Sequence, residues 1–264
     1  IGAEVTDIVD MTVVGNPIMH HIFLGLDPQQ LGQAPFPLIV NEAVIISVSE
    51  LGLEAVNKGA QAYLLPCIAG HVGADTAGVV LAEAPHQSSE MTLLIDVGTN
   101  AEIVLGNKDR ILACSSPTGP AFEGAQISCG QRAALGAIER VRIDSDTLSP
   151  KFRIIGSDLW SDDPGFVEAT ADFGVTGICG SGIIEAVAEM FLAGLVTPAG
   201  LIDGKRFPDC PWLMPDGEVY SYRLHEGHTP VVISQTDIRA IQLAKAALYA
   251  GARLLMDTLG VQTP

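Results

Sequence analysis

Residues 93–106 read LLIDVGTNAEIVLG, a pattern typical of a phosphate-binding turn between two strands. An apolar strand ends in Asp96, and a tight turn follows through Gly98, Thr99 and Asn100. Gly98 has no Cβ and lets a phosphate approach the backbone, while Thr99 and Asn100 can donate hydrogen bonds to it. A carboxylate at the strand end suits a phosphate that carries Mg²⁺. The alternative is an ordinary β-hairpin with a polar tip.

The composition is that of a globular protein with a strongly acidic surface. The 264 residues are 48% hydrophobic and 17% charged, and the net charge is −17. This length allows one or two domains. With no basic stripe, nucleic acid and anionic membrane are excluded as partners, and a protein partner would present a basic face. Neither a signal peptide nor an apolar run of about 18 residues is present, so we expect a cytoplasmic protein.

The five cysteines are scattered, odd in number and form no C-x-x-C pair. They predict neither a disulfide framework nor a zinc or iron–sulfur site within this chain. The chain starts at Ile1 without an initiator methionine and stops at Pro264 just after a strong helical pattern. We therefore expect it to be a piece of a longer protein.

The first third of the chain predicts alternating strands and helices, the pattern of an α/β protein. A strand over 8–15 precedes Asn16, which predicts a helix cap with Pro17 at the first helical position. We expect Met19, Ile22 and Phe23 to form the apolar side of that helix. Further along, the sequence predicts a strand over 42–48, a short helix over 50–59, a strand over 63–70 and a helix over 73–84. The polar break at 85–90 is the expected lobe boundary.

The rest of the chain begins with a predicted β-meander over 92–96, 101–106 and 110–115. A helix is expected directly after GVTGICGSG (174–182), with Ile183, Ile184, Val187, Met190 and Phe191 as its apolar positions. The clearest helix follows Ser234 and ends at Gly260. Between these elements, the segments 158–172 and 197–230 have the composition of surface excursions, and Asp216-Gly217 predicts a hairpin.

A second glycine-rich candidate for phosphate binding is Gly180-Ser181-Gly182, where a loop enters a helix. The free N–H groups of a first helical turn and the helix dipole favour an anion there. The alternative is that these glycines only relieve steric crowding. Because a nucleotide needs several contacts, two such segments in one chain favour the phosphate-binding interpretation.

Two carboxylates are candidates for catalysis. Glu123, in the loop that starts at Gly119, could hold a magnesium-bound water or act as a general base, and the simpler interpretation is a solvated loop carboxylate. Asp75 could face the same metal, although a helix N-cap is the simpler interpretation. His20 and His21 are adjacent and point to different sides of a helix, so they cannot bind one metal and are expected to be structural.

Together these segments resemble a known family. The ordered blocks are GNPIMHHIFLGLDP (15–28), LPCIAGHVGAD (65–75), LLIDVGTNAEIVLGNKDRILACSSPTGPAFEGAQISCG (93–130), GICGSGIIEAV (177–187) and QTDIRAIQLAKAA (235–247). They resemble the actin-like ATPase domain of the reductive activators of corrinoid proteins, which belongs to the superfamily of sugar kinases, heat-shock chaperones and actin. The resemblance covers nearly the whole chain.

The resemblance implies a partial actin-like ATPase fold with ribonuclease-H-like lobes. Residues 1–88 would be the end of the first lobe, including the connecting helix, and residues 89–264 the second lobe with inserted surface segments. ATP and Mg²⁺ are the implied cofactors, held by Asp96 (metal), Gly98, Thr99, Asn100, Gly119, Gly180, Ser181 and Gly182, with Glu123 and Asp75 as catalytic groups.

Activators of this kind use ATP hydrolysis to drive an electron onto an inactive cob(II)alamin protein. The implied partner is thus a corrinoid protein of a methyltransferase system, and a homodimer is one assembly that the chain could form. The electron comes through an iron–sulfur domain of the 2Fe-2S ferredoxin kind, expected outside this chain.

Three features of the family pattern are not found in this sequence. The first-lobe phosphate motif, the glycine-rich segment that clasps adenosine and the cluster-binding cysteines are all missing from it. We therefore expect half of a nucleotide site, and no activity from the fragment alone. Two alternatives remain at this point: a small-molecule kinase of the same superfamily, and a non-catalytic docking module.

Overall fold

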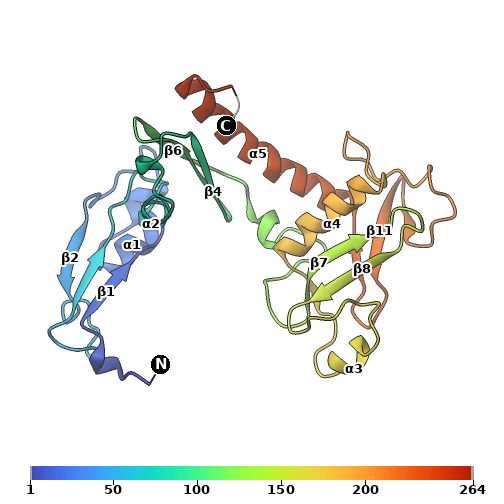
Figure 1. The fold of residues 1–264 in the computed structure, drawn as a ribbon, viewed down its shortest axis with the longest axis horizontal. Helices are drawn as coiled ribbons and strands as arrows, with labels where there is room; N and C mark the ends of the chain where they lie inside the picture. The colour runs from blue at the N-terminus through green and yellow to red at the C-terminus, as the bar shows by residue number, and fades with distance from the viewer. Residues whose placement is uncertain (1, 263–264) are drawn as a thin grey trace. The chain divides into compact units, whose positions relative to one another are not determined.

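The computed structural model describes residues 2–262 and divides the chain into two units that alternate along the sequence (Figure 1). Unit 1 comprises Ile1–Asp96, Glu102–Ser116 and Ala250–Pro264, and unit 2 comprises Val97–Ala101 and Pro117–Tyr249. Within residues 2–262, no helix combines the length and the apolar character that crossing a bilayer requires. The expected class, a mixed α/β fold with small mixed sheets, is confirmed.

Unit 1 begins with a three-stranded mixed sheet. Its order is β1 (Asp10–Val13), β3 (Gln61–Leu64), β2 (Val44–Ser47), with β1 parallel and β2 antiparallel to β3. Strand β3 alternates exposed and buried residues, so that Ala62 and Leu64 enter the core and Tyr63 faces outward. Parallel pairing of β1 and β3 requires a long crossover, and it contains helix α1 and strand β2.

Helix α1 (Pro17–Phe23) starts as predicted, but it buries a different side. The side chain of Asn16 accepts a hydrogen bond from the N–H of Met19 at 2.9 Å, with Pro17 next in the chain. However, Met19 and Ile22 are 62% and 60% exposed, whereas Pro17, His20 and His21 are buried. The predicted apolar side was therefore wrong for two of its three residues, because the packed side of this short helix includes the imidazoles.

The rest of unit 1 is built on helix α2 (Ala74–Glu83) and the predicted meander. Strands β4 (Thr92–Val97), β5 (Ala101–Gly106) and β6 (Ile111–Ser116) form a three-stranded sheet in that order. The central strand is the most buried, with Ile103, Val104 and Leu105 at most 1% exposed. The C-terminal part of α5 (Gln235–Leu259) also belongs to this unit, and its Gly251 carbonyl accepts a hydrogen bond from the thiol of Cys114.

Two predictions in this region were wrong or displaced. Residues 50–59 form a series of turns rather than a helix, because Asn57 folds its side chain back onto the N–H of Gly59 and also donates to the carbonyl of Thr6. The strand expected over 63–70 lies at 61–64, and the chain beyond it is irregular.

Unit 2 combines two small sheets with helices. In one sheet, β7 (Ala137–Ile143) lies between antiparallel β8 (Pro150–Ile154) and parallel β9 (Gly177–Ile178). The other sheet is an antiparallel array of β10 (Leu213–Asp216), β11 (Val219–His225) and β12 (Val231–Ile233). The hairpin predicted at Asp216-Gly217 joins β10 to β11, whereas β12 was not predicted.

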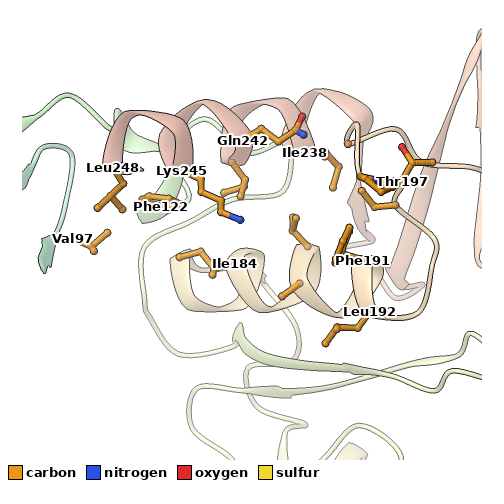
Figure 2. A pocket seen from close by; sticks show the side chains of 16 residues that line it. Val97, Phe122, Ile184, Phe191, Leu192, Thr197, Ile238, Gln242, Lys245 and Leu248 are labelled. Carbon is orange, nitrogen blue, oxygen red and sulfur yellow. The ribbon is translucent and has the colours of Figure 1, made fainter. Parts of the chain in front are cut away.

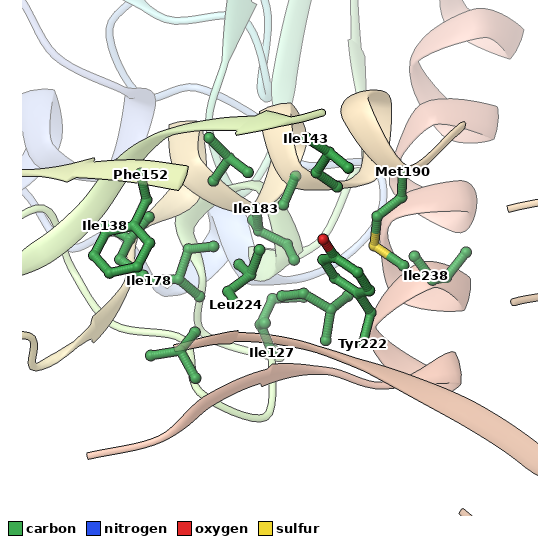
Figure 3. Close-up of a cluster of buried hydrophobic side chains, with 14 of the residues drawn as sticks. Ile127, Ile138, Ile143, Phe152, Ile178, Ile183, Met190, Tyr222, Leu224 and Ile238 are labelled. Carbon is green, nitrogen blue, oxygen red and sulfur yellow. The ribbon is translucent and has the colours of Figure 1, made fainter. Parts of the chain in front are cut away.

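The core of unit 2 gathers side chains from both sheets and from α4 (Gly180–Leu192) and α5 (Figure 3). Ile183 and Met190 of α4 are fully buried in it, together with Tyr222 of β11. Burial raises the pKa of Tyr222 far above its usual range, so the hydroxyl stays protonated and donates to the carbonyl of Leu148 at 2.8 Å. The remaining short helix, α3 (Phe166–Ala169), contributes Phe166.

Candidate functional site

Hydrogen bonds join the predicted phosphate turn to the loop that follows β6. The hydroxyl of Thr118 donates to the carbonyls of Gly98 and Thr99 at 2.8 and 3.0 Å, and the N–H of Gly119 donates to the carbonyl of Thr99 at 2.9 Å. The hydroxyl of Thr99 donates to a carboxylate oxygen of Glu123 at 2.8 Å. All these residues belong to unit 2, so the fold brings Gly98, Thr99, Gly119 and Glu123 together at one place.

The start of α4 packs against the same loop. Glu123 ends a short 3₁₀ helix, η4 (Pro120–Glu123), and a Cβ placed on Gly180 would overlap the carbonyl oxygen of Phe122. A Cβ on Gly182 would overlap the carbonyl oxygen of Ile138 in the same way. Both glycines are therefore required for backbone contact within the protein, which supports the steric interpretation of this segment. The phosphate interpretation stays a prediction.

The same helix start still presents free backbone donors. Gly180, Ser181 and Gly182 are the first three residues of α4, whose N–H groups precede the intrahelical ladder. The hydroxyl of Ser181 contacts the thiol of Cys179 at 3.3 Å, and the N-cap is a cysteine without a side-chain cap. Such a helix start, beside Glu123 and the 98–100 turn, is an arrangement that can hold phosphate oxygens.

A pocket of about 720 Å³ adjoins these residues in unit 2 (Figure 2). Val97 and Phe122, the neighbours of Gly98 and Glu123, belong to its lining. Most of the other lining residues are apolar side chains of α4 and α5, among them Ile184, Phe191, Ile238, Ile241 and Leu248. Its volume and apolar walls are those of small-molecule sites.

Sequence reasoning missed the polar residues of this pocket. Gln242 and Lys245 project from α5, and Figure 2 shows Lys245 reaching into the space between the two helices. The signal was available, because Ile238, Ile241, Lys245 and Leu248 are spaced by three and four residues and so share one side of a helix.

The N-terminus of α5 is hydrogen-bonded to the segment that follows Glu123. Asp237 is 1% exposed, and its carboxylate accepts hydrogen bonds from the N–H groups of Ser128 and Ser234, both at 2.8 Å. Both serine hydroxyls also donate to it. Asp237 thus holds the segment after Glu123 in place as well as the first turn of the helix.

The carboxylates Asp75 and Asp96 lie in unit 1 with a third that was not predicted, Glu102 on β5. Burial raises the pKa of Glu102, and the negative charges of Asp75 and Asp96 raise it further. A hydrogen bond from the hydroxyl of Ser115 at 3.0 Å lowers the pKa and offsets part of this rise. Asp75 and Asp96 therefore each lie close enough to Glu102 to disfavour its charged form. Such repulsion is relieved by a cation.

Asp75 is not the N-cap of α2, which corrects the simpler of its two interpretations. The cap is Gly73, and Asp75 is the second helical residue, with a carboxylate oxygen that accepts the N–H of Thr76 at 2.8 Å. A Cβ on residue 73 would clash with the carboxylate of Asp75 and with the backbone of Gly15, so this position requires glycine.

Protein side chains alone do not form a metal site in the part of the chain that the structure describes. Among residues 2–262, no group of three His, Cys, Asp or Glu side chains could hold a metal ion, and the five cysteines are free. Asp96 is exposed at the end of β4, and an exposed carboxylate fits Mg²⁺ that keeps most of its ligands from phosphate and water.

Comparison with known families decides the assignment. A family model described as the C-terminal domain of RACo, the ASKHA domain, matches residues 90–264, and one described as the RACo middle region matches residues 1–88. The chain belongs to the RACo family. The resemblance inferred from the sequence blocks is thereby confirmed, and residues 90–264 are the ASKHA part of a RACo-type protein.

Individual relatives agree with the RACo assignment. The chain is 34% identical to the corrinoid activation enzyme RamQ of Eubacterium limosum, over 98% of the chain and 42% of that protein. It is 28% identical to the [Co(II) methylated amine-specific corrinoid protein] reductase of Methanosarcina barkeri, over 96% of the chain and 46% of that protein. A solved reductive activator for corrinoid, iron–sulfur protein matches with a TM-score of 0.78 and 33% identity, over 98% of the chain and 39% of that structure. The chain thus spans less than half the length of each relative.

Proposed function

We propose that this chain is the nucleotide-binding part of an ATP-dependent reductive activator of a corrinoid protein. The observation that carries the proposal is the consecutive match of the RACo middle region and the ASKHA domain to residues 1–88 and 90–264. Relatives that match almost the whole chain are named for corrinoid activation or for reduction of a corrinoid protein.

The geometry of unit 2 supports a nucleotide as its ligand. The phosphates would lie at the 98–100 turn and at the start of α4, whose first three N–H groups are available. The nucleoside would enter the adjoining pocket, whose walls suit an aromatic base and whose Lys245 and Gln242 offer hydrogen bonds. Glu123, already oriented by Thr99, would hold a water or accept its proton during hydrolysis.

Mg²⁺ is the proposed metal, with Asp96 as its protein ligand. When bound, it would neutralise phosphate charge. The electron donor is proposed to be an iron–sulfur domain outside this chain. ATP acts through linkage. A nucleotide that binds one conformation of the activator more tightly increases the population of that conformation, and this change alters the affinity for the corrinoid partner.

The test is reduction of cob(II)alamin by the full-length protein. The protein is mixed with a corrinoid protein in the cob(II)alamin form and a reductant, and the Co(I) spectrum is followed with and without Mg-ATP. The proposal predicts Co(I) formation only when ATP is present and ADP production in the same samples. Equal reduction without ATP would rule it out, and ATP consumption matched to phosphorylation of a metabolite would indicate a kinase instead.

A further inference from the structure

Asp237 is a buried carboxylate that the proposed chemistry does not use. It lies in the first turn of α5 and is 1% exposed. Among the residues that the structure describes, no lysine, arginine or histidine forms an ion pair with it. Burial of a carboxylate is costly unless hydrogen bonds replace its water. The donors around Asp237 therefore indicate its role.

One oxygen of Asp237 completes the N-terminal cap of α5. Oδ2 accepts hydrogen bonds from the N–H and from the hydroxyl of Ser234, both at 2.8 Å. The Ser234 hydroxyl oxygen in turn accepts the N–H of Asp237 at 3.2 Å. This reciprocal pair is a capping box. Because a capping box needs only one carboxylate oxygen, it does not explain the contacts of the other.

The second oxygen of Asp237 binds a loop that lies 109 residues earlier in the chain. Oδ1 accepts hydrogen bonds from the N–H of Ser128 at 2.8 Å and from its hydroxyl at 3.1 Å. Two N–H groups and two hydroxyls thus donate to one carboxylate. A carboxylate only accepts and has about four lone-pair positions, so it can satisfy all of these donors, whereas a carboxamide has a single oxygen.

The loop that contains Ser128 continues directly from Glu123. Gly124 has a φ of +83°, and a Cβ there would lie 2.8 Å from the carbonyl oxygen of Gln131. A Cβ on Gly130 would overlap the carbonyl oxygen of Gly124. The loop therefore closes tightly on itself. Because of this close backbone contact, a shift of Ser128 would also move Gly124, the neighbour of Glu123.

The two elements that Asp237 joins also line one pocket. Phe122 precedes Glu123, Ile238 follows Asp237, and both belong to the lining of the pocket between α4 and α5 (Figure 2). The same carboxylate thus keeps this wall of the pocket and the loop of Glu123 at a fixed spacing. Catalysis requires such fixed spacing between the bound ligand and the group that acts on it.

We propose that Asp237 is the positioning residue of Glu123. Its hydrogen bonds to Ser128 hold the loop on α5, and the loop sets the place of the carboxylate that Thr99 orients. Asp237 itself contacts neither the nucleotide nor the water. The role of Glu123 in hydrolysis rests on the proposed function, whereas the attachment of the loop rests on hydrogen bonds within this chain.

The first measurement is amide hydrogen exchange of residues 120–130 in the full-length wild type, Asp237→Asn and Asp144→Asn. Asp144 is the matched control, because its carboxylate also accepts N–H groups and a hydroxyl in unit 2, in the turn between β7 and β8. We expect exchange at least about tenfold faster in Asp237→Asn and within about twofold of the wild type in Asp144→Asn. Equal exchange in all three proteins would overturn the proposal.

The second measurement is kcat for hydrolysis of Mg-ATP under the conditions of the reduction assay. We expect Asp237→Asn to lower kcat at least about tenfold in the wild-type background, but at most about twofold when Glu123 is already alanine, because Asp237 acts through Glu123. Losses that multiply would indicate a purely structural role and overturn the proposal. If Asp237→Asn does not fold, Ser128→Ala removes one hydroxyl donor and should give the same pattern with kcat about threefold lower.

The two measurements separate the role of Asp237 from the proposed function. Faster exchange in Asp237→Asn without ATP hydrolysis by the wild type would show that Asp237 holds the loop and that the proposed function fails. ATP hydrolysis by the wild type with unchanged exchange and unchanged kcat in Asp237→Asn would leave the proposed function intact and overturn the role of Asp237.

Discussion

Replacement of Gly180 by alanine tests how the candidate site is assembled. The added methyl group would overlap the carbonyl oxygen of Phe122 and lie 3.3 Å from the Cα of Glu123. These are backbone atoms, which cannot rotate away as a flexible side chain can. Either α4 or the η4 turn must move, and with it the carboxylate that Thr99 orients.

The magnitude follows from two opposing effects. Overpacking of a tight contact costs about 1–3 kcal/mol, and a contact to backbone belongs at the upper end of that range. Alanine gains up to about 1 kcal/mol over glycine within a helix. We therefore expect a net loss of ~2 kcal/mol in the free energy of unfolding of unit 2, which corresponds to a fall of ~4–8 °C in its Tm.

The assay is calorimetric unfolding, with Gly78→Ala as the matched control. A Cβ on Gly78 of α2 would lie 3.4 Å from a methyl of Val14, an ordinary contact, so this variant should be more stable than the wild type by up to about 1 kcal/mol. The two variants should therefore change the free energy of unfolding in opposite directions. A Gly180→Ala protein as stable as the wild type would show that the start of α4 does not depend on its contact with η4.

Three further predictions follow from individual side chains. Thr99→Val and Glu123→Ala should each weaken Mg-ATP binding about fivefold, and the double variant no further, because one hydrogen bond joins the two residues; additive losses would refute the coupling. Burial lowers the pKa of His20 from 6.5 in the folded protein, so on acidification the unfolded state binds the proton first. The free energy of unfolding should therefore be highest above pH 6.5 and should fall as the pH drops through the pKa of the folded state. Burial also lowers the pKa of His225, so denaturant unfolding should show a shallower slope in His20→Leu than in the wild type, and equal slopes would contradict the prediction. Glu185→Ala should cost about 1–3 kcal/mol in the same assay, because it leaves the N–H of Val141 without its acceptor; an unchanged midpoint would contradict this.

Local signals predicted the elements that depend on a few neighbouring residues. The cap at Asn16, the meander and the two long helices follow from turn chemistry and helical spacing, and the structure contains each of them. The helix expected over 50–59 failed because the hydrogen bonds of Asn57 to Gly59 and Thr6 favour turns there, and Thr6 is far away in sequence.

The candidate site was only partly predictable for a related reason. Gly98, Thr99, Gly119 and Glu123 were expected to act together, and hydrogen bonds join them. The exposure of Met19 and the burial of His20 depend on which elements pack against α1, which spacing alone does not reveal. Glu102 likewise gains its importance from Asp75, a residue distant in the chain.

The most direct test of the account is the dependence of cob(II)alamin reduction on Mg-ATP in full-length wild-type, Asp96→Ala and Asp109→Ala proteins. Asp109 is an exposed carboxylate in the next turn of the meander and serves as the control. We predict ATP-dependent reduction by the wild type and by Asp109→Ala, and for Asp96→Ala a Mg-ATP requirement at least about tenfold higher, equivalent to ~1.4 kcal/mol of lost binding. The same Mg-ATP dependence in all three proteins would contradict the assignment of Asp96 and of the turn that follows it to nucleotide binding.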